Sequence, residues 1–471
     1  MVGIKSYGVY IPYFRLSRAE VAKSWGGYPY PGERAVANYD EDTITMAVAA
    51  CRDCIRGFDP QEVDSLFLAS TTFPYGEKQS SSMVAAAVDL KKDALTLDLS
   101  GSLKSGTVGV RLAFDAIRSG SAKSALVSAS DMRMGLPSGS KELEFGDGAS
   151  AFFLGDTEVI ATIDSFYTSN EDLFDVFRPV EENYIRSWED RFCREVGYNR
   201  VVLETVTAAA KKFKFTARDF TKAVLYAPNT GYLTGVARML GFDLKTQVQD
   251  SLFNTIGNTG TALSLMMLAS ALDEAKPGDK ILWVGYGDGC DVMVLTVTDE
   301  ITKIQSRKTV QKHLASKNSL SYPKYLRWRS VIKTEPPMRP RPEPASAVAL
   351  YRDRKCGMAL YGVKCRQCGT VQYPVQRVCM NCLAKDNFED YRFADRIGRI
   401  TTFSHDNLAV SPDPPSTIAA VDFEEGGRIM MDVTDRDPAE IKIGMPVEMT
   451  FRHIRYVEGI HNYWWKCRPV R

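Results

Sequence analysis

The sequence predicts a large layered α/β domain followed by two small domains, the last of them all-β. Three observations support this prediction. The chain has 471 residues, which exceeds what one ordinary hydrophobic core holds. Apolar strand-like runs alternate with helical stretches as far as about residue 300, which is typical of α/β layers. A proline-dense segment then precedes a cysteine cluster and a series of short strands.

The overall composition indicates which kinds of partner and which cellular compartment to expect. The chain is 44% hydrophobic and 25% charged, with a net charge of +1. This balance argues against a nucleic-acid or membrane-surface partner. No apolar run reaches the ~18 residues of a membrane span, and the N-terminal segment lacks the apolar stretch of a signal peptide. We therefore expect a cytoplasmic protein.

The first domain is expected to contain two similar halves. Gly146-Asp-Gly148 and Gly287-Asp-Gly289 are each followed by an apolar run, which indicates an internal repeat of about 150 residues. The halves are placed at about 1–165 and 166–300. The main expected elements are the strands 65–70, 95–99, 124–129, 223–227 and 280–284, and the helices 108–118 and 262–275.

A linker and a small barrel are expected after residue 335. The prolines of 336–350 favour an extended linker. Residues 389–471 contain short alternating strands separated by glycine turns, which predicts a small barrel of about five strands. Its expected strands are 399–404, 418–423, 428–433 and 447–451.

The segment 351–388 carries two Cys-x-x-Cys knuckles, Cys365/Cys368 and Cys379/Cys382. Four thiolates at this spacing favour a zinc ribbon, although free thiols and an iron–sulfur site are alternatives. Four protein ligands leave no position for substrate, so the zinc is expected to be structural. Cys51-x-x-Cys54 lies in a helical pattern, and it and the other scattered cysteines are expected to be reduced and buried.

Three segments carry a resemblance to a known family. Val2–Pro12, Glu33–Thr43 and Tyr322–Trp328 resemble archaeal and bacterial hydroxymethylglutaryl-CoA synthases, of the thiolase superfamily, over about residues 1–335. The C-terminal part is similar to zinc-ribbon/OB modules that accompany such enzymes. The resemblance implies a duplicated thiolase-type α/β/α/β/α domain and a coenzyme A thioester as substrate.

The family's catalytic cysteine, glutamate and histidine are all replaced in this chain. Within the resembling segments they fall on Leu103, Thr71 and Tyr226. Residues 1–312 contain no histidine, so this stretch cannot supply a Cys–His pair by itself. A leucine side chain cannot attack a thioester, and cysteine-dependent condensation by this chain is therefore not expected.

Other parts of the resemblance persist. Asn258 lies in the family's second-half active-site loop, and Tyr226 and Asn258 are the catalytic candidates. Three glycines that allow close backbone approach are the candidates for binding the CoA ester: Gly257, Gly287 and Gly289. Simple packing of Tyr226 and a folding role for Asn258 and the glycines remain alternatives. Glu77, Cys290, His405, His453 and His461 are weaker candidates.

Three functional hypotheses follow from the resemblance. The first is a CoA-thioester-handling component of a complex in which a partner thiolase supplies the nucleophile, the chain being a homodimer or hetero-oligomer. The second is a cysteine-independent aldolase or lyase that acts on a β-hydroxyacyl-CoA. The third is hydroxymethylglutaryl-CoA synthase itself. The aromatic and basic segment 452–466 would suit nucleic acid on an OB barrel, but the neutral net charge favours acyl-CoA or protein contact.

Overall fold

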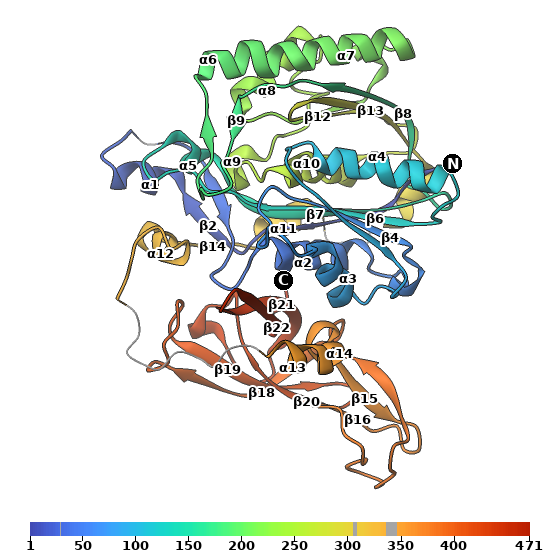
Figure 1. The fold of residues 1–471 in the computed structure, drawn as a ribbon, viewed down its shortest axis with the longest axis vertical. Helices are drawn as coiled ribbons and strands as arrows, with labels where there is room; N and C mark the ends of the chain where they lie inside the picture. The colour runs from blue at the N-terminus through green and yellow to red at the C-terminus, as the bar shows by residue number, and fades with distance from the viewer. Residues whose placement is uncertain (29, 305–308, 336–345) are drawn as a thin grey trace. The chain divides into compact units, whose positions relative to one another are not determined.

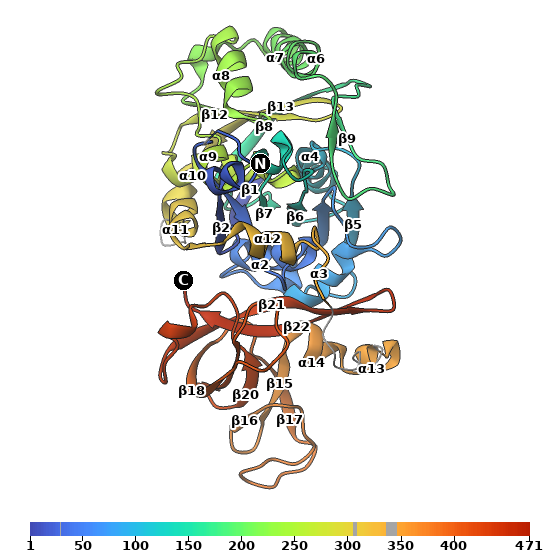
Figure 2. The ribbon, with the colours of Figure 1, turned by 90° about the vertical axis from the view of Figure 1, so that its left-hand side faces the viewer.

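The computed structural model describes residues 1–28, 30–304, 309–335 and 346–471. The chain forms two compact units (Figures 1 and 2). Unit 1 comprises Met1–Ala37, Asp42–Ala85 and Leu90–Tyr325, and unit 2 comprises Asn38–Glu41, Ala86–Asp89 and Leu326–Arg471. In the described part of the chain, no helix has both the length and the apolar character needed to cross a bilayer.

A nine-stranded mixed sheet forms the frame of unit 1, with the strand order β11-β12-β13-β8-β1-β7-β6-β4-β5. Most of its strands are apolar and buried, as expected where helices cover both faces of a sheet, whereas β5 and the second part of β8 are partly exposed. In chain order the strands are β1 (Gly3–Tyr10), β4 (Ser65–Ala69), β5 (Leu95–Leu99), β6 (Ala125–Met132), β7 (Asp147–Gly155), β8 (Ala161–Asn170), β11 (Lys222–Leu225), β12 (Lys280–Tyr286) and β13 (Gly289–Val297).

The strand pairing repeats between the two halves of this sheet. In the first half, β4 runs parallel to β6, and β6, β7 and β1 then pair antiparallel in succession. In the second half, β11 runs parallel to β12, and β12, β13 and β8 pair antiparallel in the same way. β1 and β8 join the halves through a short antiparallel contact. The expected duplication is therefore present in the topology.

Helices form three layers around the two halves of the sheet (Figures 1 and 2). The central layer holds α4 (Ser105–Arg118) and α10 (Thr261–Glu274), and twelve successive residues of α10 are buried because sheet lies on both of its sides. The outer layers hold α2 (Thr43–Cys54) and α3 (Ser80–Val88) on one side, and α7 (Arg200–Phe213) and α8 (Thr230–Met239) on the other.

Shorter elements complete unit 1. A small sheet has the order β14-β2-β3, and β9 pairs with β10. A π-helix, Cys193–Asn199, connects α6 to α7. The shorter elements are β2 (Phe14–Ser17), α1 (Arg18–Ser24), β3 (Glu33–Val36), α5 (Ser140–Glu144), β9 (Val176–Phe177), β10 (Arg186–Ser187), α6 (Asp190–Phe192), α9 (Phe253–Ile256), α11 (Val310–Ala315) and β14 (Asn318–Ser319); α12 (Tyr322–Trp328) spans the boundary with unit 2.

Unit 2 contains two short helices, a three-stranded ribbon and a five-stranded antiparallel sheet. The helices are α13 (Ala347–Arg352) and α14 (Arg354–Ala359). The ribbon consists of β15 (Tyr361–Cys365), β16 (Val371–Gln372) and β17 (Phe388–Arg392). The five-stranded sheet has the order β20-β19-β18-β21-β22 and consists of β18 (Ile397–Asp406), β19 (Ser416–Phe423), β20 (Arg428–Asp432), β21 (Pro446–Val457) and β22 (Ile460–Pro469).

The predicted fold class is confirmed. The structure also shows where the predicted strands and the predicted linker differ from the observed elements. The expected strands coincide with β4, β5, β6, β11 and β12, and those of the barrel with β18 to β21. Buried and exposed residues alternate along β20 and the first part of β18, as expected for strands that cover a core with one face. Most of the expected linker, 336–345, lies outside the described residues. α13 begins at Ala347, within the last residues of that expected linker, because Ser346 caps the helix by accepting from the Ala349 N–H.

Candidate active site

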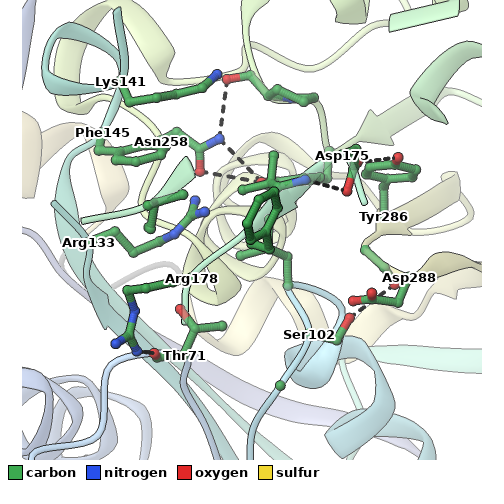
Figure 3. Close-up of a pocket in the computed structure, with 18 of the residues that line it drawn as sticks. Thr71, Ser102, Arg133, Lys141, Phe145, Asp175, Arg178, Asn258, Tyr286 and Asp288 are labelled. Atoms are coloured by element: carbon green, nitrogen blue, oxygen red, sulfur yellow. Dashed lines mark hydrogen bonds between the residues drawn. The ribbon is translucent and has the colours of Figure 1, made fainter. Parts of the chain in front are cut away.

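A pocket of about 200 Å³ opens where the carboxyl ends of β4, β5, β6, β11 and β12 meet (Figure 3). In α/β sheets, this edge is where ligands commonly bind. The lining comes from the loops that follow these strands and from two loops of the second half. It consists of Thr71, Ser100, Gly101, Ser102, Leu103, Arg133, Lys141, Glu144, Phe145, Asp175, Val176, Phe177, Arg178, Ile185, Tyr226, Pro228, Asn258, Tyr286, Gly287 and Asp288.

Tyr226 and Asn258, the two predicted catalytic candidates, meet in this pocket. Tyr226 follows β11, and its ring is buried; the Asn258 amide donates to the Tyr226 hydroxyl at 3.2 Å and to the Pro228 carbonyl at 3.2 Å. Asn258 Oδ1 accepts from the Gly260 N–H at 3.0 Å, which fixes the amide orientation. Burial raises the pKa of Tyr226, so the phenol stays protonated and acts as a hydrogen-bond donor rather than as a base.

A carboxyl group that the sequence analysis did not identify lies across the pocket from this pair. The Tyr286 hydroxyl donates to Asp175 Oδ2 at 2.6 Å, and the Val176 N–H donates to Oδ1 at 2.7 Å (Figure 3). Burial nevertheless raises the pKa of Asp175, because desolvation outweighs these two hydrogen bonds. A carboxylate with a raised pKa in a pocket is a candidate general base.

The π-helix Cys193–Asn199 packs against Tyr286 and Tyr226. A Cβ added at Gly197 would lie 3.1 Å from the Tyr286 hydroxyl oxygen, so the absence of a side chain there makes room for Tyr286. The neighbouring Tyr198 hydroxyl donates to the Tyr226 carbonyl at 2.8 Å. Short π-helical segments are frequent at functional sites.

Three cationic side chains also line the pocket, from different segments of unit 1. Lys141 pairs with Glu144 at 2.8 Å. The Arg178 guanidinium donates to the carbonyls of Thr71 and Glu182, each at 2.9 Å. Arg133, which follows β6, lies beneath Asn258 in the view of Figure 3 and stacks on the Phe145 ring at 4.3 Å.

Thr71 and Leu103, where the family's glutamate and cysteine are expected, both line the pocket. Thr71 is held by Asp131, whose Oδ1 accepts from the Thr71 N–H at 2.7 Å and from its hydroxyl at 3.0 Å. Leu103 precedes α4, and its side chain is partly buried against the core of unit 1. The lining of this pocket contains neither cysteine nor histidine among the described residues.

The three predicted binding glycines lie around this pocket, and close packing explains each of them. Gly287 lines it, and a Cβ there would lie 2.9 Å from the Leu103 N atom. Gly257 has φ 81°, and a Cβ there would meet the Gly146 N atom at 2.9 Å. A Cβ at Gly289 would meet the Ser169 carbonyl oxygen at 2.2 Å. A role in binding remains a prediction for all three.

The weaker candidates lie outside the pocket lining. Glu77 is exposed on the segment between β4 and α3, and Cys290 is fully buried in β13, where burial raises the pKa of its thiol. The histidines predicted as distant candidates belong to the strands of unit 2: His405 contacts the Thr417 hydroxyl at 2.9 Å, and His453 contacts His461 at 3.0 Å.

The four ribbon cysteines converge as the spacing predicted. Their sulfur atoms all lie within 4.8 Å of one another, with Cys365–Cys382 at 3.6 Å and Cys368–Cys379 at 3.5 Å. Four thiolates at Zn–S distances of about 2.3 Å would lie about 3.8 Å apart in a tetrahedron, so the cluster fits Zn²⁺. The hydroxyl of Thr370 and its N–H lower the pKa of Cys368 to about 6, which favours the thiolate.

Four residues that line the pocket were not among the candidates predicted from the sequence: Asp175, Arg133, Arg178 and Tyr286. Tyr286 ends β12 and Arg133 directly follows β6, both at the carboxyl edge of the sheet, and that position is a signal readable from the sequence. Asp175 and Arg178 lie in the irregular stretch between β8 and α6, where no local pattern marks a pocket residue.

Comparisons with known protein families identify two domains in the C-terminal part of the chain. The family described as "ChsH2, rubredoxin-like zinc ribbon domain" matches residues 359–389. The family described as "ChsH2, C-terminal OB-fold domain" matches residues 391–452. The predicted zinc ribbon and OB fold are thereby confirmed.

Unit 1 resembles solved structures and curated sequences of one kind. A structure described as "HMG_CoA synthase complexed with CoA" superimposes with a TM-score of 0.63 over 69% of this chain and 89% of its own, at 18% identity. The hydroxymethylglutaryl-CoA synthase of Archaeoglobus fulgidus is 32% identical over 344 residues, covering 71% of this chain and all of that protein. That of Methanosphaera stadtmanae is 32% identical over 345 residues, covering 71% of this chain and 99% of that protein. The chain therefore belongs to the hydroxymethylglutaryl-CoA synthase family.

Proposed function

We propose that the pocket of unit 1 binds an acyl-CoA thioester and makes or breaks a carbon–carbon bond without a covalent acyl-enzyme. The reaction is an aldol-type addition or cleavage at a β-hydroxyacyl-CoA. One observation supports this most: the pocket combines a carboxyl group of raised pKa with a buried phenol–amide pair, while a leucine occupies the expected nucleophile position. The names of the curated relatives support CoA esters as the substrate class.

Asp175 is the base in this proposal. In the cleavage direction it accepts the proton of the β-hydroxyl group as the Cα–Cβ bond breaks and a carbonyl compound leaves. The electron pair of that bond passes into the thioester, whose oxygen becomes an enolate. The α-carbon then takes this proton back from Asp175, directly or through water, which forms the shortened acyl-CoA and regenerates the carboxylate. A base with a raised pKa suits this step because it binds the abstracted proton more strongly than an exposed aspartate does.

Tyr226 and Asn258 stabilise the enolate oxygen. The phenol stays protonated because burial raises its pKa, and its contact to Asn258 Oδ1 is a long one, at 3.4 Å. A thioester oxygen at this position would accept a shorter hydrogen bond from the phenol. Fixed donors aimed at developing charge are the largest single contribution in many such reactions.

The decisive experiment measures cleavage of 3-hydroxy-3-methylglutaryl-CoA and 3-hydroxybutyryl-CoA by the purified chain, with products identified by mass spectrometry. Tyr226→Phe is expected to lower kcat by about 100-fold or more, because it removes one donor to the enolate oxygen. Cys290→Ala, outside the pocket lining, is the matched control and is expected to keep the activity. Formation of an acyl-enzyme on any cysteine would contradict the proposal.

A second candidate function is a subunit that binds the CoA ester for a partner thiolase. The leucine at position 103 favours it, since a partner would have to supply the missing nucleophile. The native mass of the complex isolated from its source, with its components identified, tests this hypothesis. A stoichiometric thiolase with an intact Cys–His pair, together with an inactive isolated chain, would favour the partner role over the lyase.

The third candidate, hydroxymethylglutaryl-CoA synthase activity, is supported by the names of the relatives. The same purified chain can be incubated with acetyl-CoA and acetoacetyl-CoA. Release of free CoA with formation of 3-hydroxy-3-methylglutaryl-CoA would establish synthase activity and would require a nucleophile other than a group at position 103.

A further inference from the structure

Arg133 is a buried cation without a partner. Its residue is 5% exposed, and burial lowers the pKa of its guanidinium. Among the residues that the structure describes, its Nε has no hydrogen-bond partner and no carboxylate lies within ion-pair distance of it. An unpaired buried charge is costly, and an unsatisfied buried polar group calls for an explanation, such as a ligand or ion that completes it.

Other buried arginines of unit 1 differ in this respect. Arg18 donates to the carbonyls of Leu143 and Phe253, and Arg34 donates to those of Glu142 and Phe145. Their guanidinium groups stabilise the fold because each donates to main-chain carbonyls of segments distant in the sequence. Arg133 has no such contact, although it lies equally deep.

The surroundings of Arg133 fix its guanidinium and direct it to the pocket. The planar group stacks on the Phe145 ring at 4.3 Å. Its stem lies against Gly260, where an added Cβ would come within 2.8 Å of the Arg133 Cδ atom. Nearby carboxylates are already engaged, since Glu144 pairs with Lys141 and Asp131 accepts hydrogen bonds from threonine and serine hydroxyls.

The location of Arg133 indicates which part of a ligand it meets. It lines the pocket beside Tyr226, and its charge lowers the pKa of that phenol against the opposing effect of burial. In the proposed function Tyr226 contacts the thioester oxygen, so Arg133 faces the acyl group. The phosphates of CoA are separated from the thioester by the whole pantetheine arm.

We infer that the substrate's acyl chain ends in a carboxylate and that Arg133 binds this carboxylate through a bidentate pair of hydrogen bonds. This inference rests on the proposed function, which places the thioester at Tyr226 and therefore the acyl chain at Arg133. A planar guanidinium matches a carboxylate in geometry as well as in charge. Arg178, which donates only to main-chain carbonyls in the described residues, adds positive charge at the same side.

The test compares two unreactive ligands by isothermal titration of the full chain. Glutaryl-CoA carries a terminal carboxylate, and 5-methylhexanoyl-CoA carries an isopropyl group of the same shape. Neither has a β-hydroxyl group, so the result does not depend on lyase activity. We expect glutaryl-CoA to bind the wild-type chain at least about 10-fold more tightly, and Arg133→Met to abolish this preference.

Arg111→Met is the matched control. Arg111 also stacks on a phenylalanine, Phe166 at 4.7 Å, but it pairs with Asp115 at 2.6 Å and lies outside the pocket lining. This variant is expected to keep the preference for glutaryl-CoA. Free CoA is titrated as a third ligand, and an equal loss of its affinity in Arg133→Met would assign the guanidinium to a phosphate and overturn the inference.

A stability measurement separates ligand binding from a structural role. Arg133→Met removes an unpaired buried charge, so the ligand-free variant is expected to melt at or above the temperature of the wild-type chain. A melting temperature several degrees lower would indicate a structural arginine and overturn the inference. Equal affinity of the wild-type chain for both acyl-CoA ligands, or binding of neither, would also overturn it, whereas failure of lyase activity alone would not.

Discussion

At the scale of single residues, burial determines which protonation state the ionisable groups of the pocket favour. Asp175 and Tyr226 differ from exposed residues of the same types because desolvation disfavours their charged forms. The Tyr286 hydroxyl opposes this effect at Asp175, since its hydrogen bond stabilises the carboxylate. The balance between the two influences sets the pH range in which Asp175 accepts a proton.

A pH profile tests this balance. If Asp175 is the base, kcat/KM for cleavage should fall as the pH falls through its raised pKa, above the ordinary aspartate value of about 3.9. Tyr286→Phe removes a hydrogen bond that lowers this pKa, so the acidic limb should move to higher pH. Asp175→Asn should lower kcat by about 100-fold or more at every pH, because the amide cannot accept the proton.

Tyr232→Phe is the matched control for this experiment. Tyr232 also donates to a carboxylate, that of Asp190 at 2.9 Å, but neither residue lines the pocket. Loss of the Tyr232 hydroxyl should leave the acidic limb of the pH profile unchanged. An acidic limb that stays in place in Tyr286→Phe would show that Asp175 is not the titrating base.

At the scale of elements, one buried carboxylate joins the loop after β4 to the start of α10. Asp131 Oδ1 accepts from the hydroxyls of Ser70, Thr71 and Thr72, and Oδ2 accepts from the N–H and hydroxyl of Thr261. The two segments that it joins contribute Thr71 and Asn258 to the pocket. Asp131 is therefore a positioning residue for both halves of the site.

Asp131→Asn should destabilise unit 1 by about 2–4 kcal/mol, because the amide NH₂ would face hydrogen-bond donors and leave them unsatisfied. Calorimetric unfolding measures this loss. Asp115→Asn, which removes an exposed partner of Arg111, should cost less than about 1 kcal/mol. Equal losses in the two variants would contradict the joining role of Asp131.

The ribbon is an element whose stability depends on its metal. Purified chain should contain about one Zn²⁺, and Cys379→Ser should lose it, because a closed structural site needs all four thiolates. Hydrogen exchange of β15 and β17 should then increase. Cys356→Ser is the control, since this thiol contacts the Tyr373 hydroxyl and lies outside the cluster. Full zinc content in Cys379→Ser would exclude the four-cysteine site.

At the scale of the whole molecule, charges far apart in the sequence meet inside unit 2. Arg452 contacts Asp40 at 3.1 Å, Glu41 at 2.7 Å and Asp435 at 2.5 Å, and its side chain is fully buried. Asp40 lies 412 residues before Arg452. Burial alone would raise the pKa of Asp435, but the surrounding arginines together lower it, so the charged form is favoured in the folded chain.

Arg452→Met should destabilise unit 2 by about 3–5 kcal/mol, since three buried carboxylates would lose their shared cation. Arg428→Met, which removes an exposed pair with Asp422, should change stability by less than about 1 kcal/mol. Differential scanning calorimetry distinguishes the two outcomes. A small effect of Arg452→Met would mean that the remaining cations compensate within unit 2.

The sequence by itself determined the features that depend on local spacing. The two Cys-x-x-Cys knuckles specified the metal ribbon, because four ligands at that spacing have one compact arrangement. Alternating apolar runs specified the strands. The resemblance placed Leu103 at the nucleophile position and identified Tyr226 and Asn258 as catalytic candidates. Each of these depends on neighbours within a few residues or on a motif that survives in the chain.

The protonation and the pairing of the pocket groups depend on the tertiary structure. Asp175 lies in an irregular segment, and its raised pKa comes from residues packed around it from other elements. The isolation of Arg133 is likewise invisible in the sequence, since every arginine has the same charge until its partners are known. Burial and pairing are properties of the folded chain, and they set the free energy of each charged group.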